Sequence, residues 1–394
     1  HDQDVPKRVA AASLLQQDHS PFHEQEVTVL QQHLEAFAAG CGYNCVWDWS
    51  VPPGQPYSLH ALQAFSAFAD DADDTLFHSL LQGVPTGYNA DIPASKEFSS
   101  CNNSTVNDSS LCICEGNWAG ANADPELLDQ LVDKEVAAGY LQEVESLAAA
   151  SALWGEDVAV GKLNIVKADG RKPQLIVDSS ICGTNASCTI PEKYSLPSLS
   201  SVRRCFPLRK CTEDIHGFSL DVEAAHKTIR VRESEQGLLG VRNRDKLYFY
   251  KVCPFGAAFS AFWFQRVSSF LVRMLHLLIF APHALLMYVD DLLLFQALSS
   301  IFDSATLALA FCVVFNIPVS WKKLQLSETI LWIGWEFNFR AGALRVPDSK
   351  REKLMDRIPP MLRGRHVERN DLEKVLGTIR WLCQLYPEQR SWLR

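Results

Sequence analysis

The chain has 394 residues, 47% of them hydrophobic and 21% charged, with a formal net charge of −9. This length predicts two or three domains with sizeable cores. No stretch of about 20 residues is both free of charge and apolar enough to span a bilayer, which excludes a membrane-spanning helix and favours a soluble protein. The N-terminus has no basic segment followed by an apolar one, which argues against a secretory signal and favours an intracellular location, in the cytoplasm or nucleus.

The charge is divided unevenly along the chain. Residues 1–160 hold 4 Lys and Arg against 24 Asp and Glu, whereas residues 161–394 hold 33 against 22. Such an asymmetry predicts a basic part that faces nucleic acid and an acidic appendage. A helical domain with a solvated basic face remains an alternative for the C-terminal part. The first residue is His rather than Met, which favours a fragment or a piece of a longer polyprotein.

The N-terminal third contains no familiar motif. Residues 1–24 are polar and are expected to be frayed, whereas residues 25–82 have helical apolar spacing. Asp70-Asp71 and Asp73-Asp74 fall in an acidic stretch that solvation explains. Residues 83–124 are rich in Gly, Pro, Asn, Ser and Asp, which predicts a linker or long loop.

Helix and strand patterns follow from residue 125. A helical pattern begins at Pro125 and precedes two strand-like runs at 163–167 and 174–178, which are separated by a turn and predict a hairpin. Further helices are expected at 256–280 and 302–315. Residues 372–382 are amphipathic and predict a helix close to the C-terminus.

Two adjacent carboxylates interrupt an apolar run. Asp290 and Asp291 lie within residues 285–295, which are otherwise apolar apart from Tyr288. A chain keeps a buried carboxylate only where something offsets its charge. Two apolar strands that meet at this point would place both acids at the tip of a hairpin, where a divalent metal ion could bind. An ordinary surface turn is the alternative interpretation.

Five motifs around this pair resemble those of reverse transcriptases, and they occur in that family's order. The motifs are residues 218–226 (FSLDVEAAH), 253–266 (CPFGAAFSAFWFQR), 288–291 (YVDD), 321–326 (WKKLQL) and 331–337 (LWIGWEF). The resemblance covers about residues 125–394 and is closest to retrotransposon enzymes of the LTR and DIRS-like types. It implies an α+β right-hand polymerase fold. The implied parts are an acidic N-terminal extension of unknown role at 1–124, fingers at 125–194, a palm with remaining fingers elements at 195–338, and a thumb at 339–394.

The resemblance also implies an activity and its cofactor. It implies RNA-directed DNA synthesis from an RNA template, a DNA primer and dNTPs, with two Mg²⁺ ions that Mn²⁺ may replace. Asp221, Asp290, Asp291 and the backbone carbonyl of Val222 are the implied metal ligands. Because 69 residues separate Asp221 from Asp290, the two must meet across neighbouring strands.

The remaining implied site residues bind the nucleotide and the primer. The nucleotide set is His226, Ala225, Phe255, Gly256, Lys167, Arg171, Lys172 and Lys323, and the primer-grip set is Trp332, Ile333, Gly334 and Trp335. Lys322 competes with Lys323 for its role. The chain departs from the family at three positions. His226 stands where retroviral and LTR enzymes carry Tyr or Phe, Gln174 stands where the family usually has Arg, and Cys253 stands where Leu is usual.

Two other functions share this sequence pattern. An RNA-templated RNA polymerase uses the same palm chemistry, and a degenerate copy could bind nucleic acid without catalysis. The sequence keeps all three carboxylates.

Overall fold

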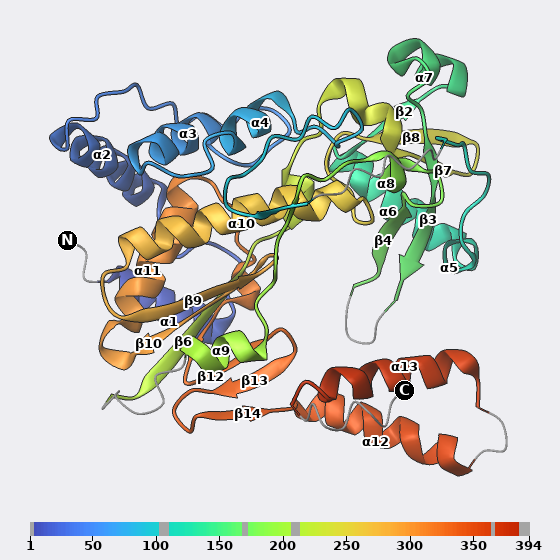
Figure 1. The fold of residues 1–394 in the computed structure, drawn as a ribbon. Coiled ribbons are helices and arrows are strands. Elements are labelled where there is room, and N and C mark those ends of the chain that lie inside the picture. The colour runs from blue at the N-terminus through green and yellow to red at the C-terminus, as the bar shows by residue number, and fades with distance from the viewer. Residues whose placement is uncertain (1–3, 102–109, 168–171, 206–212, 364–366, 386–394) are drawn as a thin grey trace.

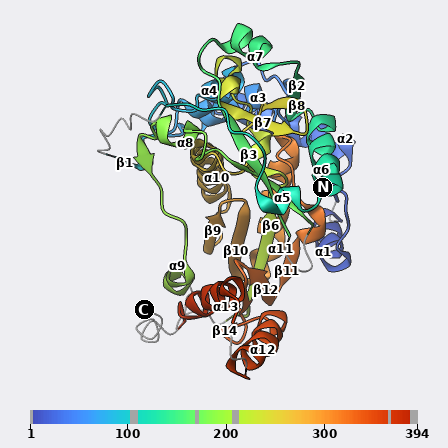
Figure 2. The ribbon, with the colours of Figure 1, turned by 90° about the vertical axis from the view of Figure 1, so that its right-hand side faces the viewer.

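The computed structural model describes residues 4–101, 110–167, 172–205, 213–363 and 367–385. The expected α+β class is confirmed: helices surround four sheets among these residues. Figures 1 and 2 show the fingers at one end of the molecule, the thumb helices at the other, and the palm between them. Within the described ranges, no helix combines the length and the apolar character that crossing a bilayer requires.

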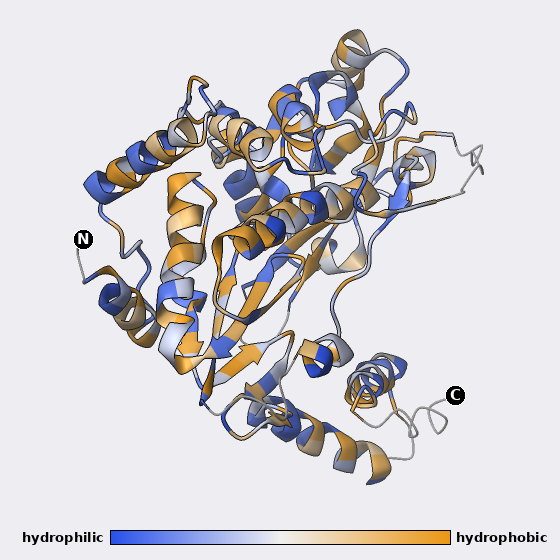
Figure 3. Cartoon of the chain, turned by 60° about the vertical axis from the view of Figure 1, so that its left-hand side comes forward, coloured by the Kyte–Doolittle hydropathy of each residue, from blue (hydrophilic) through white to orange (hydrophobic). Residues whose placement is uncertain are grey.

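The palm is an antiparallel sheet with two dissimilar faces. Its strands, in spatial order, are β11 (Gln325–Ser327), β6 (Ile215–Asp221), β10 (Asp291–Ala297) and β9 (His283–Tyr288). Side chains alternate between faces along each strand. Leu292 and Leu294 join the main core with α10 (Ala258–Leu278) and α11 (Leu298–Val314), whereas Leu293 and Phe295 join a second core. Figure 3 shows that the palm strands are hydrophobic along most of their length.

The fingers contain a five-stranded sheet built from three separate parts of the chain. Its strands, in spatial order, are β2 (Leu141–Val144), β8 (Lys246–Tyr250), β7 (Gly240–Asn243), β3 (Val160–Val166) and β4 (Gln174–Asp178). The predicted pairing of β3 with β4 is confirmed, and the turn between them lies outside the described residues. The flanking helices are α5 (Ala119–Asn122), α6 (Pro125–Ala137), α7 (Leu147–Trp154), α8 (Thr184–Ser187) and η2 (Glu233–Leu239). The helix predicted from Pro125 is therefore confirmed as α6.

A small sheet connects the palm to the thumb. It comprises β12 (Thr329–Trp332), β13 (Trp335–Asn338) and β14 (Ala343–Arg345), and it is followed by α12 (Asp348–Arg363) and α13 (Arg369–Leu382). Trp335 stacks on Trp381 of α13 with ring centroids 3.8 Å apart. The Lys350 ammonium of α12 lies 3.7 Å from the same Trp381 ring. This aromatic contact fixes the thumb helices against the sheet.

The N-terminal third, which the sequence predicts to be an acidic extension of unknown role, packs against the palm in the structure. Its elements are α1 (Val5–Leu15), α2 (Glu24–Gly40), α3 (Leu59–Phe68), α4 (Leu76–Gln82) and β1 (Ser99–Ser100), the last paired with β5 (Glu192–Lys193). Residues 1–24 were expected to fray, but α1 contacts α11 and β11 and fully buries Val9. The described part of the segment after α4 is mostly irregular, as predicted. Val84 within it is nevertheless buried, and its N–H donates to the backbone carbonyl of Arg230 (2.8 Å).

Two acids of the N-terminal third are buried against α10, which contradicts their prediction as solvated residues. The Asp73 carboxylate accepts from two nitrogens of the Arg266 guanidinium at 2.8 and 2.5 Å, and both side chains are at most 1% exposed. Asp71 pairs in the same way with Arg273 at 2.6 and 2.8 Å. Asp71 and Asp73 therefore neutralise two arginines of α10.

Candidate active site

The palm sheet brings the three predicted carboxylates to one end. β6 and β10 pair so that Asp221 lies opposite Asp291, and β9 returns so that Tyr288 lies on the other side of Asp291. The backbone N–H of Val222 donates to the carbonyl of Asp290 (2.8 Å), which holds the hairpin turn against the end of β6. The predicted meeting of the carboxylates across neighbouring strands is therefore observed.

The turn that carries Asp290 is strained. A two-residue connection between strands requires a positive φ at its first residue, a position that Gly usually fills. Here that residue is Val289, with φ +57°. A β-branched residue in this region costs about 1–3 kcal/mol. Ser268 of α10 stabilises the turn, because its hydroxyl donates to the Val289 carbonyl at 2.6 Å.

The carboxylates disfavour one another's charge. Burial and the neighbouring Asp221 raise the pKa of Asp290. Burial, Asp221 and Asp290 raise the pKa of Asp291 to about 7, although the Ser219 hydroxyl and the Ile333 N–H favour its charged form. The Ser219 hydroxyl lies 3.2 Å from a carboxylate oxygen of Asp291. Binding of a cation would therefore stabilise the charged form of this cluster.

One cation of the chain already lies at this cluster. The Lys323 ammonium contacts both carboxylate oxygens of Asp221 at 2.8 and 2.9 Å. Lys322 instead pairs with Asp18 beside α1 at 3.2 Å. Of the two lysines that the sequence offers for this role, Lys323 faces the carboxylates and Lys322 does not.

The donor set suits a divalent metal ion, although its arrangement is incomplete. Oxygen ligands with negative charge are those that Mg²⁺ prefers, and the mutual repulsion of Asp221, Asp290 and Asp291 is what such an ion would relieve. Within the described ranges, however, no three Asp, Glu, His or Cys side chains are gathered closely enough to hold one. Metal binding would therefore require Lys323 to leave Asp221 and the carboxylates to converge.

The raised pKa of Asp291 predicts a pH-dependent stability. The folded protein binds this proton more tightly than the unfolded chain, in which the pKa of Asp is about 3.9. The contribution of the protonated Asp291 carboxyl to the free energy of unfolding is therefore complete below about pH 4. It is lost as the pH rises to about 7. In urea denaturation with a chelator present, Asp291→Asn should be more stable than wild type at pH 8 and nearly equal to it at pH 4. Parallel pH profiles for the two proteins would contradict this, and Asp303→Asn on exposed α11 is the control.

Two of the predicted nucleotide-binding residues, His226 and Phe255, belong to an aromatic cluster. The ring of His226 lies 5.0 Å from that of Phe255 and 5.9 Å from that of Phe264. Among the described residues, neither ring nitrogen of His226 has a hydrogen-bond partner. Burial lowers the pKa of His226 to about 4, so the imidazole is neutral at physiological pH. Ala225 is buried in η1 (Ala225–Thr228), directly before His226.

Gly256 is required by a close backbone approach. Its φ is +110°, and a Cβ at this position would lie 1.8 Å from the carbonyl oxygen of Val177 on β4. The amide of Asn185 braces this loop, since it donates to the Gly256 carbonyl (2.9 Å) and accepts from the Ala258 N–H (2.8 Å). The exposed edge of Phe255 is thereby fixed between fingers and palm. The sequence did not single out Asn185.

The predicted phosphate clamps of the fingers are placed unequally. Lys167 is paired with Asp124, the N-cap residue of α6, at 2.6 Å. Lys172 is exposed just before β4, and Arg171 lies outside the described residues. Lys172 is therefore better placed than Lys167 to meet a ligand.

The structure places the predicted primer-grip residues in two different environments. Both Trp332 and Trp335 are fully buried, so their indoles cannot contact a primer in this conformation. Ile333 (φ +44°) and Gly334 (φ +83°) form the turn between them and are partly exposed. The Trp332 indole N–H donates to the carbonyl of Asp291 at 3.0 Å. The hairpin is therefore hydrogen-bonded directly to a catalytic candidate.

Comparisons with known proteins give one family match and several similar solved structures. Residues 165–337 match the family described as reverse transcriptase (RNA-dependent DNA polymerase). A comparison with curated proteins gives no match. Among solved structures, a foamy viral protease-reverse transcriptase in complex with an RNA/DNA hybrid is 13% identical, with a TM-score of 0.51 over 70% of this chain and 33% of that chain. The same kind of protein in complex with dsDNA is 14% identical, with a TM-score of 0.49 over 72% and 52% of the two chains.

The chain thus spans between about a third and a half of the length of these solved proteins. The RNA/DNA-hybrid complex supports the likeness of fold. The family match includes Asp221, Asp290 and Asp291, as well as the turn of Ile333 and Gly334. Residues 165–337 of this chain therefore resemble a reverse transcriptase domain, and the RNA/DNA-hybrid complex is similar to the chain in fold.

Proposed function

We propose that the chain is an RNA-directed DNA polymerase that adds nucleotides to a primer 3′-OH by two-metal-ion catalysis. The observation that carries this proposal is the pairing of Asp221 with Asp291 across β6 and β10, beside Asp290 in a strained turn. Burial and the charge of Asp221 raise the pKa of both Asp290 and Asp291, so this cluster is costly to maintain. Binding of cations and substrate phosphates accounts for this cost.

Asp221, Asp290 and Asp291, with the backbone carbonyl of Val222, would hold two Mg²⁺ ions, and Mn²⁺ may replace them. The ions, when bound, supply the positive charge that an in-line phosphoryl transfer requires at the attacking and leaving oxygens. Lys323 would release Asp221 and is then within reach of an incoming triphosphate, where its ammonium can stabilise the leaving group. The Ser219 hydroxyl orients the Asp291 carboxylate.

The proposed substrates are an RNA template, a DNA primer and dNTPs. Support comes from the family match and from the excess of Lys and Arg after residue 160, which suits a phosphate backbone. In the sequence, Phe255 precedes Asp290 and Asp291, and the turn of Ile333 and Gly334 follows them, which is the order that the family uses. We place the base of the nucleotide at Phe255 and Gly256 and the primer end at the Ile333–Gly334 turn.

We propose that the sugar of the nucleotide lies against His226. Imidazole is smaller than the phenyl ring that related enzymes place here, and a neutral imidazole can accept or donate a hydrogen bond to a 2′-OH. His226→Phe should therefore raise the selectivity for dNTP over rNTP by about tenfold, about 1.4 kcal/mol. Single-nucleotide kcat/KM values for matched dNTP and rNTP measure this. Equal selectivity in both proteins would show that residue 226 does not line the sugar pocket.

One experiment separates this function from its alternatives. Template-dependent primer extension is measured with purified protein and Mg²⁺, with separate dNTP and rNTP pools on RNA templates. Extension with dNTPs supports the proposal, and extension with rNTPs alone indicates an RNA-templated RNA polymerase. Binding of the duplex without extension in either pool indicates a nucleic-acid-binding protein that has lost catalysis.

A further inference from the structure

A tyrosine from the N-terminal third lies directly behind the turn that carries His226. Tyr57, which precedes α3, is 1% exposed, and its hydroxyl lies 2.5 Å from the hydroxyl of Thr228 in η1. The Thr228 hydroxyl in turn lies 2.5 Å from the carbonyl oxygen of Ala225. These contacts form a chain of hydrogen bonds from outside the matched domain to the residue next to His226.

The groups involved determine which one donates in each of these two hydrogen bonds. A carbonyl can only accept, so Thr228 donates its single hydroxyl proton to Ala225. Tyr57 must therefore donate to Thr228. Burial raises the pKa of Tyr57, which keeps its hydroxyl protonated and able to donate. The direction of donation is thus from Tyr57 through Thr228 to Ala225.

The turn that receives these bonds needs support. Ala224, directly before η1, has φ +57°, a left-handed conformation that residues with a Cβ rarely adopt. Such a conformation persists only where the surrounding structure over-determines it. The hydrogen bond at Ala225 fixes the carbonyl that follows this strained residue. The position of the His226 ring depends on the same turn.

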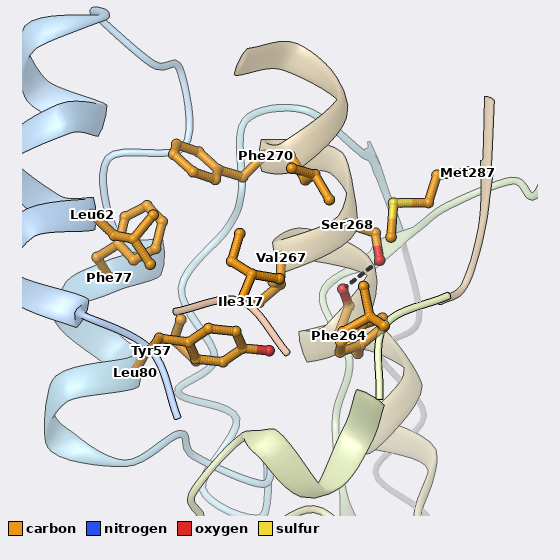
Figure 4. Close-up of a pocket in the computed structure, with 12 residues that line it drawn as sticks. Tyr57, Leu62, Phe77, Leu80, Phe264, Val267, Ser268, Phe270, Met287 and Ile317 are labelled. Carbon is orange, nitrogen blue, oxygen red and sulfur yellow. Dashed lines mark hydrogen bonds between the residues drawn. The ribbon is translucent and has the colours of Figure 1, made fainter. Parts of the chain in front are cut away.

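Tyr57 itself is held rigidly. Its ring lines a small, mainly apolar cavity, and Figure 4 shows it among other lining residues such as Phe264, Val267 and Ile317. The cavity measures about 10 Å³, which leaves room for one water molecule at most. The next residue, Ser58, is bonded through its N–H to the carbonyl of Phe315 at 3.1 Å. Phe264, which lines the same cavity, packs edge-on against His226.

We propose that Tyr57 is a positioning residue for sugar selection: its hydroxyl, acting through Thr228, fixes the η1 turn and so the distance between His226 and the nucleotide sugar. This inference rests on the proposed polymerase function. It assigns the N-terminal third a role in choosing between dNTPs and rNTPs. Although the imidazole can hydrogen-bond a 2′-OH, its ring also limits the space beside the sugar. A turn released from Tyr57 lets the ring move away, and the enlarged space then admits a 2′-OH more readily.

The kinetic test compares variants of the full chain. Tyr57→Phe and Thr228→Val should each lower the ratio of kcat/KM for dNTP over rNTP, on the order of threefold to tenfold. Thr228→Ser keeps the hydroxyl and should retain the wild-type ratio. Because Tyr57 and Thr228 act through the same series of hydrogen bonds, the double variant should lose no more selectivity than either single variant. Ser79→Ala, which removes another buried hydroxyl of the N-terminal third, is the control for general destabilisation.

A second measurement does not depend on activity. Diethyl pyrocarbonate modifies neutral histidine, and the buried ring nitrogens of His226 should be protected in the wild type. Tyr57→Phe should increase the modification rate of His226 several-fold, as measured by mass spectrometry, with exposed His33 as the internal reference. An unchanged rate, or an unchanged selectivity ratio with equal losses for both nucleotides, would overturn the inference. A wild-type protein that extends no primer defeats the proposed function, and the modification rates still decide whether Tyr57 fixes the turn.

Discussion

Replacing Asp290 by Asn is expected to abolish primer extension and to leave duplex binding nearly unchanged. The substitution keeps the shape of the side chain and removes one negative charge from the carboxylate cluster. The Asp290 backbone carbonyl still accepts from Val222, so the turn should persist. Loss of one proposed metal ligand should reduce the rate at least about a thousandfold, about 4 kcal/mol of transition-state stabilisation.

The measurement is single-turnover primer extension with saturating dNTP, together with equilibrium binding of an RNA/DNA duplex. Asp303→Asn is the matched control, because it makes the same chemical change on an exposed face of α11 in the same domain. Near wild-type extension by the Asp290 variant would refute the two-metal assignment. Equal losses of extension and binding would indicate that the variant disturbs the fold instead.

The second large effect is expected at the buried ion pair between the N-terminal third and the palm. Asp73→Ala leaves the Arg266 guanidinium, which is fully buried, without its carboxylate partner. The contacts of Arg266 with the Thr75 hydroxyl (2.7 Å) and the Pro93 carbonyl (3.1 Å) cannot neutralise the charge. Removing one partner of a buried pair costs about 3–5 kcal/mol. Urea denaturation should show this loss in the free energy of unfolding.

The neighbouring residue supplies a matched control. Asp74 also pairs with a cation, Lys96 at 2.6 Å, but both side chains are more than half exposed. Exposed pairs contribute little to stability, so Asp74→Ala should leave the midpoint of unfolding almost unchanged. Adding Arg266→Met to Asp73→Ala should recover part of the lost stability, because the buried charge is then removed. Similar destabilisation by the two alanine variants would show that the Asp73 pair is not specially important.

The parts of the site that local sequence specifies could be predicted. The strand after Pro173, the helix from Pro125 and the hairpin that carries Asp290 and Asp291 each leave a pattern within a few residues, and the structure contains all three. The meeting of Asp221 with this hairpin was predicted from their separation in sequence, which leaves only neighbouring strands to bring them together. Each of these features depends on short-range periodicity or on a recognisable run of residues.

The features that were missed depend on partners far apart in sequence. Asp73 and Arg266 are 193 residues apart, and nothing beside either of them indicates the pair. Composition placed Asp73 in a solvated stretch because burial depends on what packs over a residue. The burial of Trp332 and Trp335 was missed for the same reason, since a tryptophan beside a turn suits both a ligand contact and a core. Tyr57 had no local signal at all.

The interleaving of the N-terminal third with α10 and α11 has a consequence for how the chain is made. During synthesis, α1 to α4 leave the ribosome first, yet the surfaces that bury Val9 and Tyr57 include α11, which ends at residue 314. At a synthesis rate of 5–20 residues per second, α11 follows these helices after roughly 10–50 s. Their apolar faces are exposed to the cell during that interval, and the acidic residues beside them keep the nascent segment hydrated until the arginines of α10 emerge. The charge asymmetry of the sequence thus protects an unfinished protein as well as pairing within the finished one.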